Sequence, residues 1–254
     1  MEVVVEVGTG GWPVSASALG IGIWVFFAWC WLRAPAVARL ELVASFGFVV
    51  VAGIAAGLLG GLATDETGLS SLGGVVGAGA ALVALIRPWR PQRRWMADHL
   101  IPAGVAGLAV ARLGCLFQGC DFGRRTDGAL AVVHEAGSRA WEFHQTYFEM
   151  SAGADTSLAV HPFAAYLALW GLVSALIGEW IRRYNRGPGV AGVACATVFL
   201  AGGGAIESMR EPATVIQIAD GISAYPLLYW MGALAAGLAW WWLERAPKKR
   251  ADYE

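Results

Sequence analysis

The sequence predicts an all-α integral membrane protein with about seven transmembrane helices. Hydrophobic residues make up 57% of the 254 residues and charged residues only 15%, whereas soluble domains carry roughly 25% charged residues. Seven stretches also approach the ~20 apolar residues that a spanning helix needs; they are 15–32, 40–63, 72–86, 100–117, 160–181, 190–209 and 222–243. These spans and one long loop account for the chain, so we expect a single membrane domain over residues 1–254.

The third and fourth stretches should lie inside the helical bundle. The third is short and rich in glycine, and the fourth carries Arg112. A charge within a membrane normally faces the bundle interior or a polar cavity. We therefore expect Arg112 to point away from lipid.

The basic residues predict the orientation. Most Lys and Arg residues follow the first, third, fifth and seventh stretches, and such loops favour the cytoplasm. The N-terminus is then outside, the tail 244–254 is cytoplasmic, and a long arm, about 119–159, lies on the outer face between helices 4 and 5. The first residues include Glu2 and Glu6 but no Lys or Arg, so we expect no cleaved signal peptide.

Five arginines remain in the outer half, where the charge bias disfavours them. Guanidinium groups present a fixed fork of donors that fits phosphate oxygens, so phosphate recognition is the natural reason to keep them there. The net charge of −1 and the lack of a basic stripe give no indication of a nucleic-acid partner. The five are Arg112, Arg124, Arg125, Arg139 and Arg210.

Cys115 and Cys120 stand five residues apart. On a continuous helix this spacing is about 7.5 Å of rise, beyond the ~7 Å between Cα atoms that a disulfide allows. They can bridge only if the helix breaks, which Gly119 and Gly123 permit. A disulfide, plain packing and a chemical role of the thiols all stay open, whereas Cys30 and Cys195 are interpreted as small buried hydrophobic residues.

The histidines show no metal-ligand spacing with the cysteines, so we expect no metal site and no cofactor. His161 opens the fifth stretch and is either a polar residue at a helix start or a general base suited to a thiol. His134 and His144, in the arm, are expected to be solvated. Glu207 and Arg210 are three residues apart and can pair on one helix face, as a structural ion pair or within a site.

Four motifs stand in order between Gly68 and Pro212: "GLSSLGGVVG", "RLGCLFQGCDFGRRTDG", "VHP" and "GGGAIESMREP". Together they resemble the prolipoprotein diacylglyceryl transferase family. The resemblance implies an enzyme of the bacterial inner membrane, with its active side facing the periplasm. It would move a diacylglyceryl group from phosphatidylglycerol to a cysteine thiol of an exported lipoprotein precursor, and glycerol phosphate would leave.

Matching the motifs residue by residue implies a site. Arg112, Arg210, Glu207 and His161 correspond to residues of the family's motifs and are the candidate catalytic residues. The candidate phosphate-binding residues are Arg112, Arg124 and Arg210, with the glycines Gly114 and Gly123.

The chain departs from the family pattern at several positions, among them Cys115 and Cys120 in the signature and Ala164 and Leu167 after His161, and two departures bear most on catalysis. Leu72 stands where the family carries a histidine, and Gly203 stands where it carries an arginine. These replacements favour an alternative, a lipid-binding relative that is non-catalytic or has a different substrate. A membrane thiol–disulfide protein that uses Cys115 and Cys120 is the third possibility.

Overall fold

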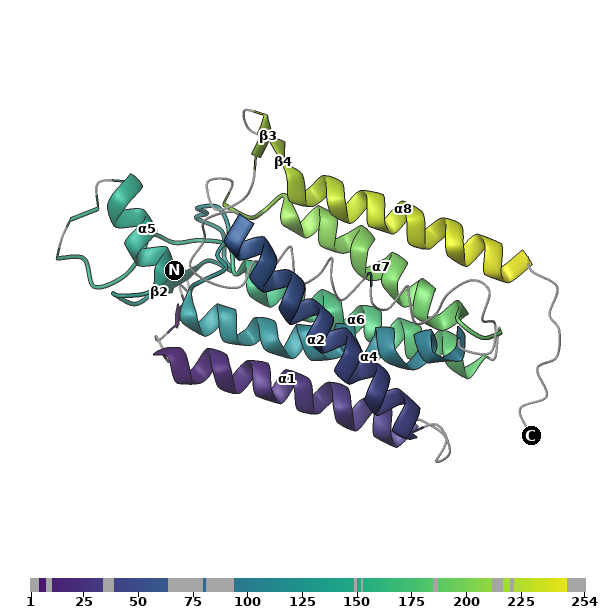
Figure 1. Cartoon of the computed structure of the whole chain (residues 1–254). Coiled ribbons are helices and arrows are strands. Elements are labelled where there is room, and N and C mark those ends of the chain that lie inside the picture. Colours follow the sequence, from purple (N-terminus) through teal and green to yellow (C-terminus); the bar gives the residue numbers. More distant parts are fainter. Residues whose placement is uncertain are drawn as a thin grey trace.

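The chain folds as a bundle of long helices with a small polar arm at one end (Figure 1). The structure is a computed structural model and describes residues 5–7, 11–33, 39–63, 80, 94–148, 150–151, 153–184, 187–211, 217–219 and 222–245. Within these ranges the helices are α1 (Gly11–Arg33), α2 (Arg39–Ala63), α4 (Arg94–Gln118), α5 (Arg139–Tyr147), α6 (Phe163–Arg183), α7 (Val190–Glu207) and α8 (Ala224–Arg245). The strands are β1 (Val5–Val7), β2 (Val132–His134), β3 (Gln217–Ala219) and β4 (Ile222–Ser223).

The predicted helical class is confirmed, with short strands added at one end. Six of the seven predicted stretches coincide with helices α1, α2, α4, α6, α7 and α8. The third, 72–86, lies outside the described residues apart from residue 80, and Leu72 lies outside them too. Among the described residues, α4, α6 and α7 are long and apolar enough to cross a membrane. The count of seven spans and the orientation stay predictions.

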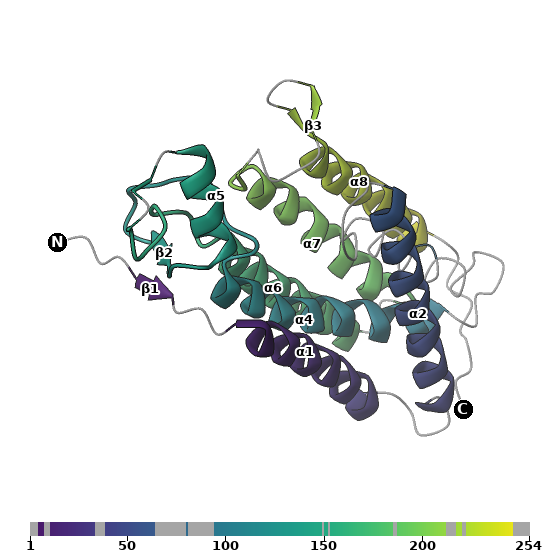
Figure 2. The ribbon, with the colours of Figure 1, turned by 60° about the vertical axis from the view of Figure 1, so that its left-hand side comes forward.

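Helix α4 organises the bundle. It packs against α1 on one side and against α6 and α7 on another, and α7 in turn packs against α8; Figure 2 shows this arrangement from a second direction. Glycines allow the closest approach: a Cβ on Gly107 of α4 would lie only 2.6 Å from the backbone oxygen of Gly22 on α1. Small residues let membrane helices pack backbone to backbone in this way.

A buried carboxylate fixes the start of α7 against α4. Asp98, on the first turns of α4, accepts hydrogen bonds from the backbone N–H groups of Gly189 (2.7 Å) and Gly192 (2.8 Å). These are unsatisfied donors at a helix N-terminus, which a carboxylate stabilises. The contact holds α4 and α7 together at the end of the bundle opposite the arm (Figure 1).

The arm between α4 and α6 has its own small core. Strand β2 pairs in parallel with β1, Val5 opposite Val132, and α5 begins at Ser138, whose Oγ accepts a hydrogen bond from the N–H of Trp141. Phe122, Val132, Ala140 and Val160 form the buried cluster beneath these elements.

The prediction that His134 and His144 are solvated is wrong. Their exposed fractions are 2% and 0%, because the arm folds around them. His144 Nδ1 accepts a hydrogen bond from the N–H of Leu158 (3.2 Å). Burial first, then the positive charge of Arg125 and the neighbouring His134, lowers the pKa of His144 to about 4, so the ring is neutral at pH 7.

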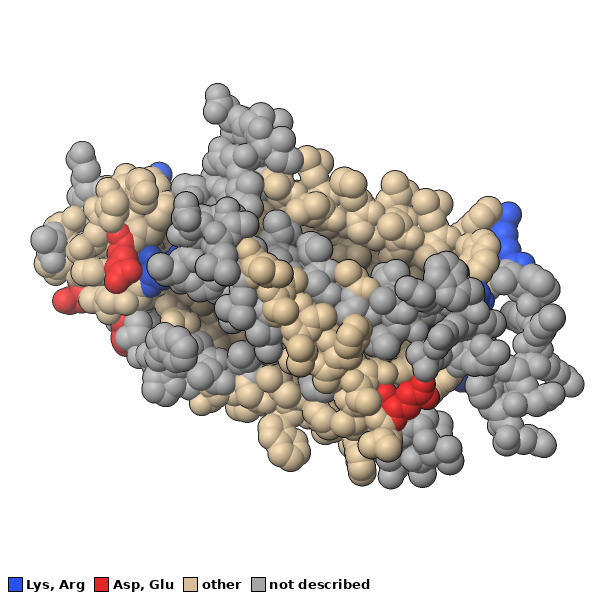
Figure 3. All heavy atoms as spheres, in the orientation of Figure 1, with Lys and Arg blue, Asp and Glu red and all other residues tan. Residues whose placement is uncertain are grey.

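The surface separates into a charged part and an apolar part. On the face drawn in Figure 3, the visible charged side chains lie at the arm and toward the opposite end, and the tan atoms between them carry no charge. Large apolar side chains are strongly exposed on several helices, among them Trp24, Leu59, Leu169 and Met231. A long molecule whose exposed middle is apolar fits a lipid environment.

Candidate functional site

The site begins where α4 ends. Gly119 follows the last helical residue, Gln118, with φ of +62°, the left-handed conformation that commonly terminates a helix on glycine. The chain then turns back and runs as an extended segment, residues 121–126. This segment lies between the end of α7 and the residues that precede α6.

Backbone hydrogen bonds join these three segments. Gly123 N–H donates to the carbonyl of His161 (3.1 Å), and His161 N–H donates back to the carbonyl of Arg124 (3.0 Å). On the other side Arg124 N–H donates to the carbonyl of Met209 (2.8 Å). A Cβ on Gly123 would lie 2.7 Å from His161 Cβ and 2.9 Å from the Met209 oxygen. Only glycine fits between the two neighbouring backbone segments without displacing them.

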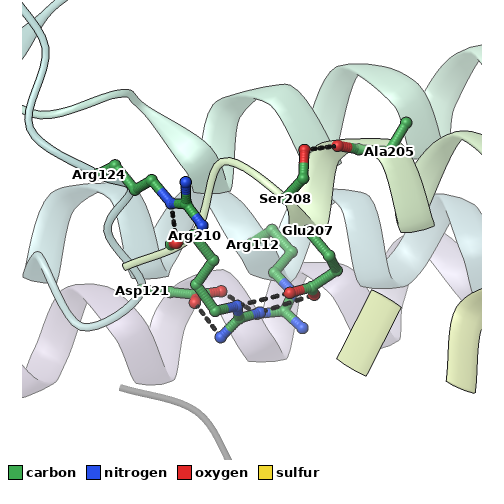
Figure 4. A network of polar contacts seen from close by, with 7 residues as sticks. All are labelled: Arg112, Asp121, Arg124, Ala205, Glu207, Ser208 and Arg210. Atoms are coloured by element: carbon green, nitrogen blue, oxygen red, sulfur yellow. Dashed lines mark hydrogen bonds and ion pairs between the residues drawn. The ribbon is translucent and has the colours of Figure 1, made fainter. Parts of the chain in front are cut away.

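Four charged side chains meet beside this junction (Figure 4). Asp121 pairs with Nη1 of Arg112 from α4 through one oxygen and with Nη1 of Arg210 through the other, the latter at 2.6 Å. Glu207, at the end of α7, accepts from Nε (2.7 Å) and Nη2 (2.9 Å) of Arg210. Asp121 and Glu207 are 8% and 1% exposed, so both carboxylates are removed from water but fully paired. We call these four residues the charge cluster.

The two arginines of the charge cluster differ in their spare donors. Arg210 uses Nε and both terminal nitrogens on carboxylates, and its guanidinium also lies over the rings of Phe163 (4.4 Å) and Tyr225 (5.4 Å). Arg112 donates only through Nη1 among the described residues. Because a guanidinium carries five N–H groups, Arg112 keeps donors for a further anion, whereas Arg210 mainly fastens the cluster.

Arg124 lies at the edge of the charge cluster. Its Nε donates to the backbone carbonyl of Arg210 (3.3 Å), and its side chain is exposed. Of the five arginines predicted to share a role, the structure therefore brings together Arg112, Arg124 and Arg210. Arg125 instead lies over the ring of Phe148 at 4.1 Å, and Arg139 is exposed at the start of α5.

His161 contributes its backbone to the site and directs its ring elsewhere. Its N–H and carbonyl hold the 121–126 segment, while Nδ1 lies 3.4 Å from the hydroxyl of Tyr166. Among the described residues its ring makes no hydrogen bond or ion pair with the charge cluster. The predicted role of His161 as a base stays a prediction.

Cys115 and Cys120 are both free thiols beside the charge cluster. The left-handed Gly119 breaks the helix between them, as a close approach requires, and Cys120 Sγ lies 4.0 Å from the backbone oxygen of Cys115. Cys30 and Cys195 are 7% and 0% exposed, which confirms them as buried small residues.

The glycines predicted for the site have separate places. Gly123 lies where the three hydrogen-bonded segments meet, and Gly114 is buried within α4. Gly203, interpreted from the sequence as the place of a missing arginine, faces α8: a Cβ there would lie 2.5 Å from Cε1 of Tyr229. The space beside Gly203 is thus filled by an aromatic ring.

Sequence reasoning assigned no role to Asp121, the residue that bridges Arg112 and Arg210. A signal was present, because two arginines predicted to share a low-dielectric site need a counter-charge. Asp121 stands inside the quoted motif that holds Arg112 and Arg124.

The N–H groups of Arg112 that the described residues leave unused have the chemistry to receive an anion, near helices that expose apolar side chains. Guanidinium groups stabilise negative charge most strongly where water is excluded. A phosphate whose lipid tails lie along exposed apolar helices is the ligand class that matches both properties.

Comparison with known proteins identifies a family with members that are named for a phospholipid. The sequence profile of the family described as prolipoprotein diacylglyceryl transferase matches residues 22–242. Several relatives carry the name phosphatidylglycerol–prolipoprotein diacylglyceryl transferase. The protein of Paraburkholderia phymatum is 31% identical over 58% of this chain and 53% of its own length. That of Pseudoalteromonas translucida is 30% identical over 74% and 64%, and that of Rhodopirellula baltica is 42% identical over 30% and 16%. The chain spans about half the length of the first of these relatives.

Proposed function

Because this chain belongs to the prolipoprotein diacylglyceryl transferase family, we propose that it transfers a diacylglyceryl group from phosphatidylglycerol to a cysteine thiol of an exported protein. It acts as a multi-pass protein of the bacterial cytoplasmic membrane, with the charge cluster on the outer side. No cofactor takes part. The names of its relatives, which pair phosphatidylglycerol with a prolipoprotein, support the choice of donor and acceptor.

One observation carries the proposal: among the described residues Arg112 is anchored by Asp121 through a single nitrogen, which leaves its other N–H groups to donate to an anion. The anchor fixes the direction of the guanidinium before any ligand arrives, and such preorganised donors are the most effective at stabilising developing charge. Arg124, exposed at the edge of the cluster, supplies the second cation. Arg210 and Glu207 hold the framework.

In the proposed reaction, negative charge develops on the phosphate oxygen of the leaving group, which these arginines would contact. The thiolate sulfur attacks the glycerol carbon that bears the phosphate, a carbon–sulfur bond forms, and the carbon–oxygen bond breaks. The electron pair stays on the phosphate oxygen, so a phosphodiester with one negative charge becomes a monoester with a second. His161 accepts the thiol proton, since an imidazole suits a thiol near neutral pH. Arg112 and Arg124 stabilise the added charge on the leaving group.

A lipid-binding relative without catalysis is the second candidate. The two carboxylates already balance the two arginines of the charge cluster, so the field for a doubly charged leaving group is weaker than that of unpaired arginines. Binding a singly charged phosphodiester needs a weaker positive field than stabilising a doubly charged leaving group. This candidate predicts affinity for phosphatidylglycerol without transfer.

The experiment measures transfer of a labelled diacylglyceryl group from phosphatidylglycerol to a peptide with a lipoprotein acceptor cysteine, catalysed by the purified protein in detergent. Arg112→Ala should lower the rate about a hundredfold, the usual loss when one donor to a developing anion is removed. Arg139→Ala is the matched control, because that arginine is exposed on the arm.

Each outcome separates the candidates. Transfer by the wild type that is lost in Arg112→Ala and kept in Arg139→Ala supports the transferase. Binding of phosphatidylglycerol that needs Arg112, without thioether formation, supports the lipid-binding relative. Transfer that is unaffected by Arg112→Ala overturns the assignment of the site.

A further inference from the structure

A pair of glycines on α7 makes room for an aromatic side chain from α8. A Cβ on Gly203 would lie 2.5 Å from Cε1 and 2.8 Å from Cδ1 of Tyr229, and a Cβ on Gly204 would lie 3.2 Å from Tyr229 Cβ. The ring of Tyr229 also lies 6.3 Å from that of Phe199, one turn away on α7. The tyrosine ring therefore lies against the bare backbone of α7, in a place that any side chain at position 203 would take.

This position brings the phenol near the charge cluster. The Tyr229 ring packs against Gly203, which is one helical turn before Glu207 of the charge cluster, and the phenol lies within electrostatic reach of all four residues of that cluster. Its hydroxyl makes no hydrogen bond to any other residue that the structure describes. A phenolic O–H is a hydrogen-bond donor, and one that the described residues leave unused near the charge cluster is placed to serve a ligand.

We propose that the Tyr229 hydroxyl donates a hydrogen bond to a phosphate oxygen of the lipid donor, together with Arg112, and that Gly203 exists to let the ring reach that place. This inference rests on the proposed function, since it names a further residue for the same phosphodiester. Phenol and guanidinium supply donors from α8 and α4, two helices on different sides of α7 (Figure 1). Between them they would fix the orientation of the headgroup.

Two substitutions test the two halves of the proposal. Tyr229→Phe removes only the hydroxyl, and it should lower kcat/KM for phosphatidylglycerol transfer about tenfold, as expected for losing a hydrogen bond to a charged group. Gly203→Ala places a methyl group against the ring and should give a loss of the same size. The fluorescence-detected melting temperature of Tyr229→Phe should match that of the wild type.

The chain offers a control for each. Tyr184→Phe removes a hydroxyl from an exposed tyrosine at the far end of α6. Gly237→Ala adds a methyl group at the same α7–α8 interface, where the nearest atom, Thr197 Cγ2, is 3.7 Å away. Both controls should keep wild-type kinetics.

Affinity for phosphatidylglycerol in nanodiscs, measured beside transfer, separates this inference from the proposed function. A wild type that binds the lipid but transfers nothing would refute the transferase, whereas weaker binding by Tyr229→Phe would still support the contact. If both residues hold one phosphate, Tyr229→Phe should cost less in an Arg112→Ala background than alone. Transfer and affinity unchanged in Tyr229→Phe would overturn the inference, and so would additive effects in the double variant.

Discussion

Replacing Asp121 by asparagine removes the charge that joins Arg112 to Arg210 while keeping the side-chain size. Each hydrogen bond between charged groups contributes roughly 1.5–3 kcal/mol, and Asp121 accepts one from each arginine. The asparagine amide keeps one acceptor oxygen, and Arg210 stays paired with Glu207. The loss per hydrogen bond therefore lies toward the lower end of this range. We expect unfolding free energy to fall by about 3 kcal/mol, in line with broken buried pairs.

The assay is thermal unfolding in detergent, followed with a dye that reacts with the buried thiols. A loss of that size corresponds to a midpoint lower by roughly 6–12 °C for a chain of this length. Asp127→Asn, at an exposed aspartate just after the 121–126 segment, should leave the midpoint unchanged. Equal midpoints for the two variants would refute the reasoning, because Asp121 would then contribute no more than a surface charge.

Two further predictions concern the junction and the arm. Gly123→Ala should destabilise the protein by about 1–3 kcal/mol, because the methyl group meets the His161 backbone; Gly153→Ala, in open space, should not, and equal melting curves would contradict this. The lowered pKa of His144, about 4 in the folded protein against 6.5, means that the unfolded chain binds more protons between these values. The contribution of neutral His144 to the free energy of unfolding is complete above pH 6.5 and falls by up to roughly 3 kcal/mol toward pH 4. His144→Phe should flatten this pH dependence, measured by amide hydrogen exchange of the arm. A slope that persists in the variant would show that another group is responsible.

Local patterns predicted the parts of the site that lie on one helix. Arg112 could be placed inside the bundle because a charge in an apolar stretch normally faces the bundle interior or a polar cavity. Glu207 and Arg210 could be paired because they are three residues apart on one face. The helix break at Gly119 was permitted by the sequence, and the structure places it there.

Contacts between distant segments could not be predicted in the same way. Asp121 meets Arg210 only because the 121–126 segment runs beside the end of α7, and nothing in the periodicity of either helix encodes that pairing. His134 and His144 were misjudged for the same reason. Polar residues in a polar loop are usually solvated, and their burial follows from a small core that forms only when the arm folds.

The central claim, that the charge cluster holds the phosphate of a membrane lipid, is tested most directly by photolabelling. A phosphatidylglycerol analogue with a diazirine in its headgroup would be crosslinked in nanodiscs, and the labelled residues mapped by mass spectrometry. The account predicts labels within 112–125 and 207–211 that unlabelled phosphatidylglycerol suppresses and Arg112→Ala weakens. Headgroup labels confined to other segments, or labelling unchanged in Arg112→Ala, would contradict it.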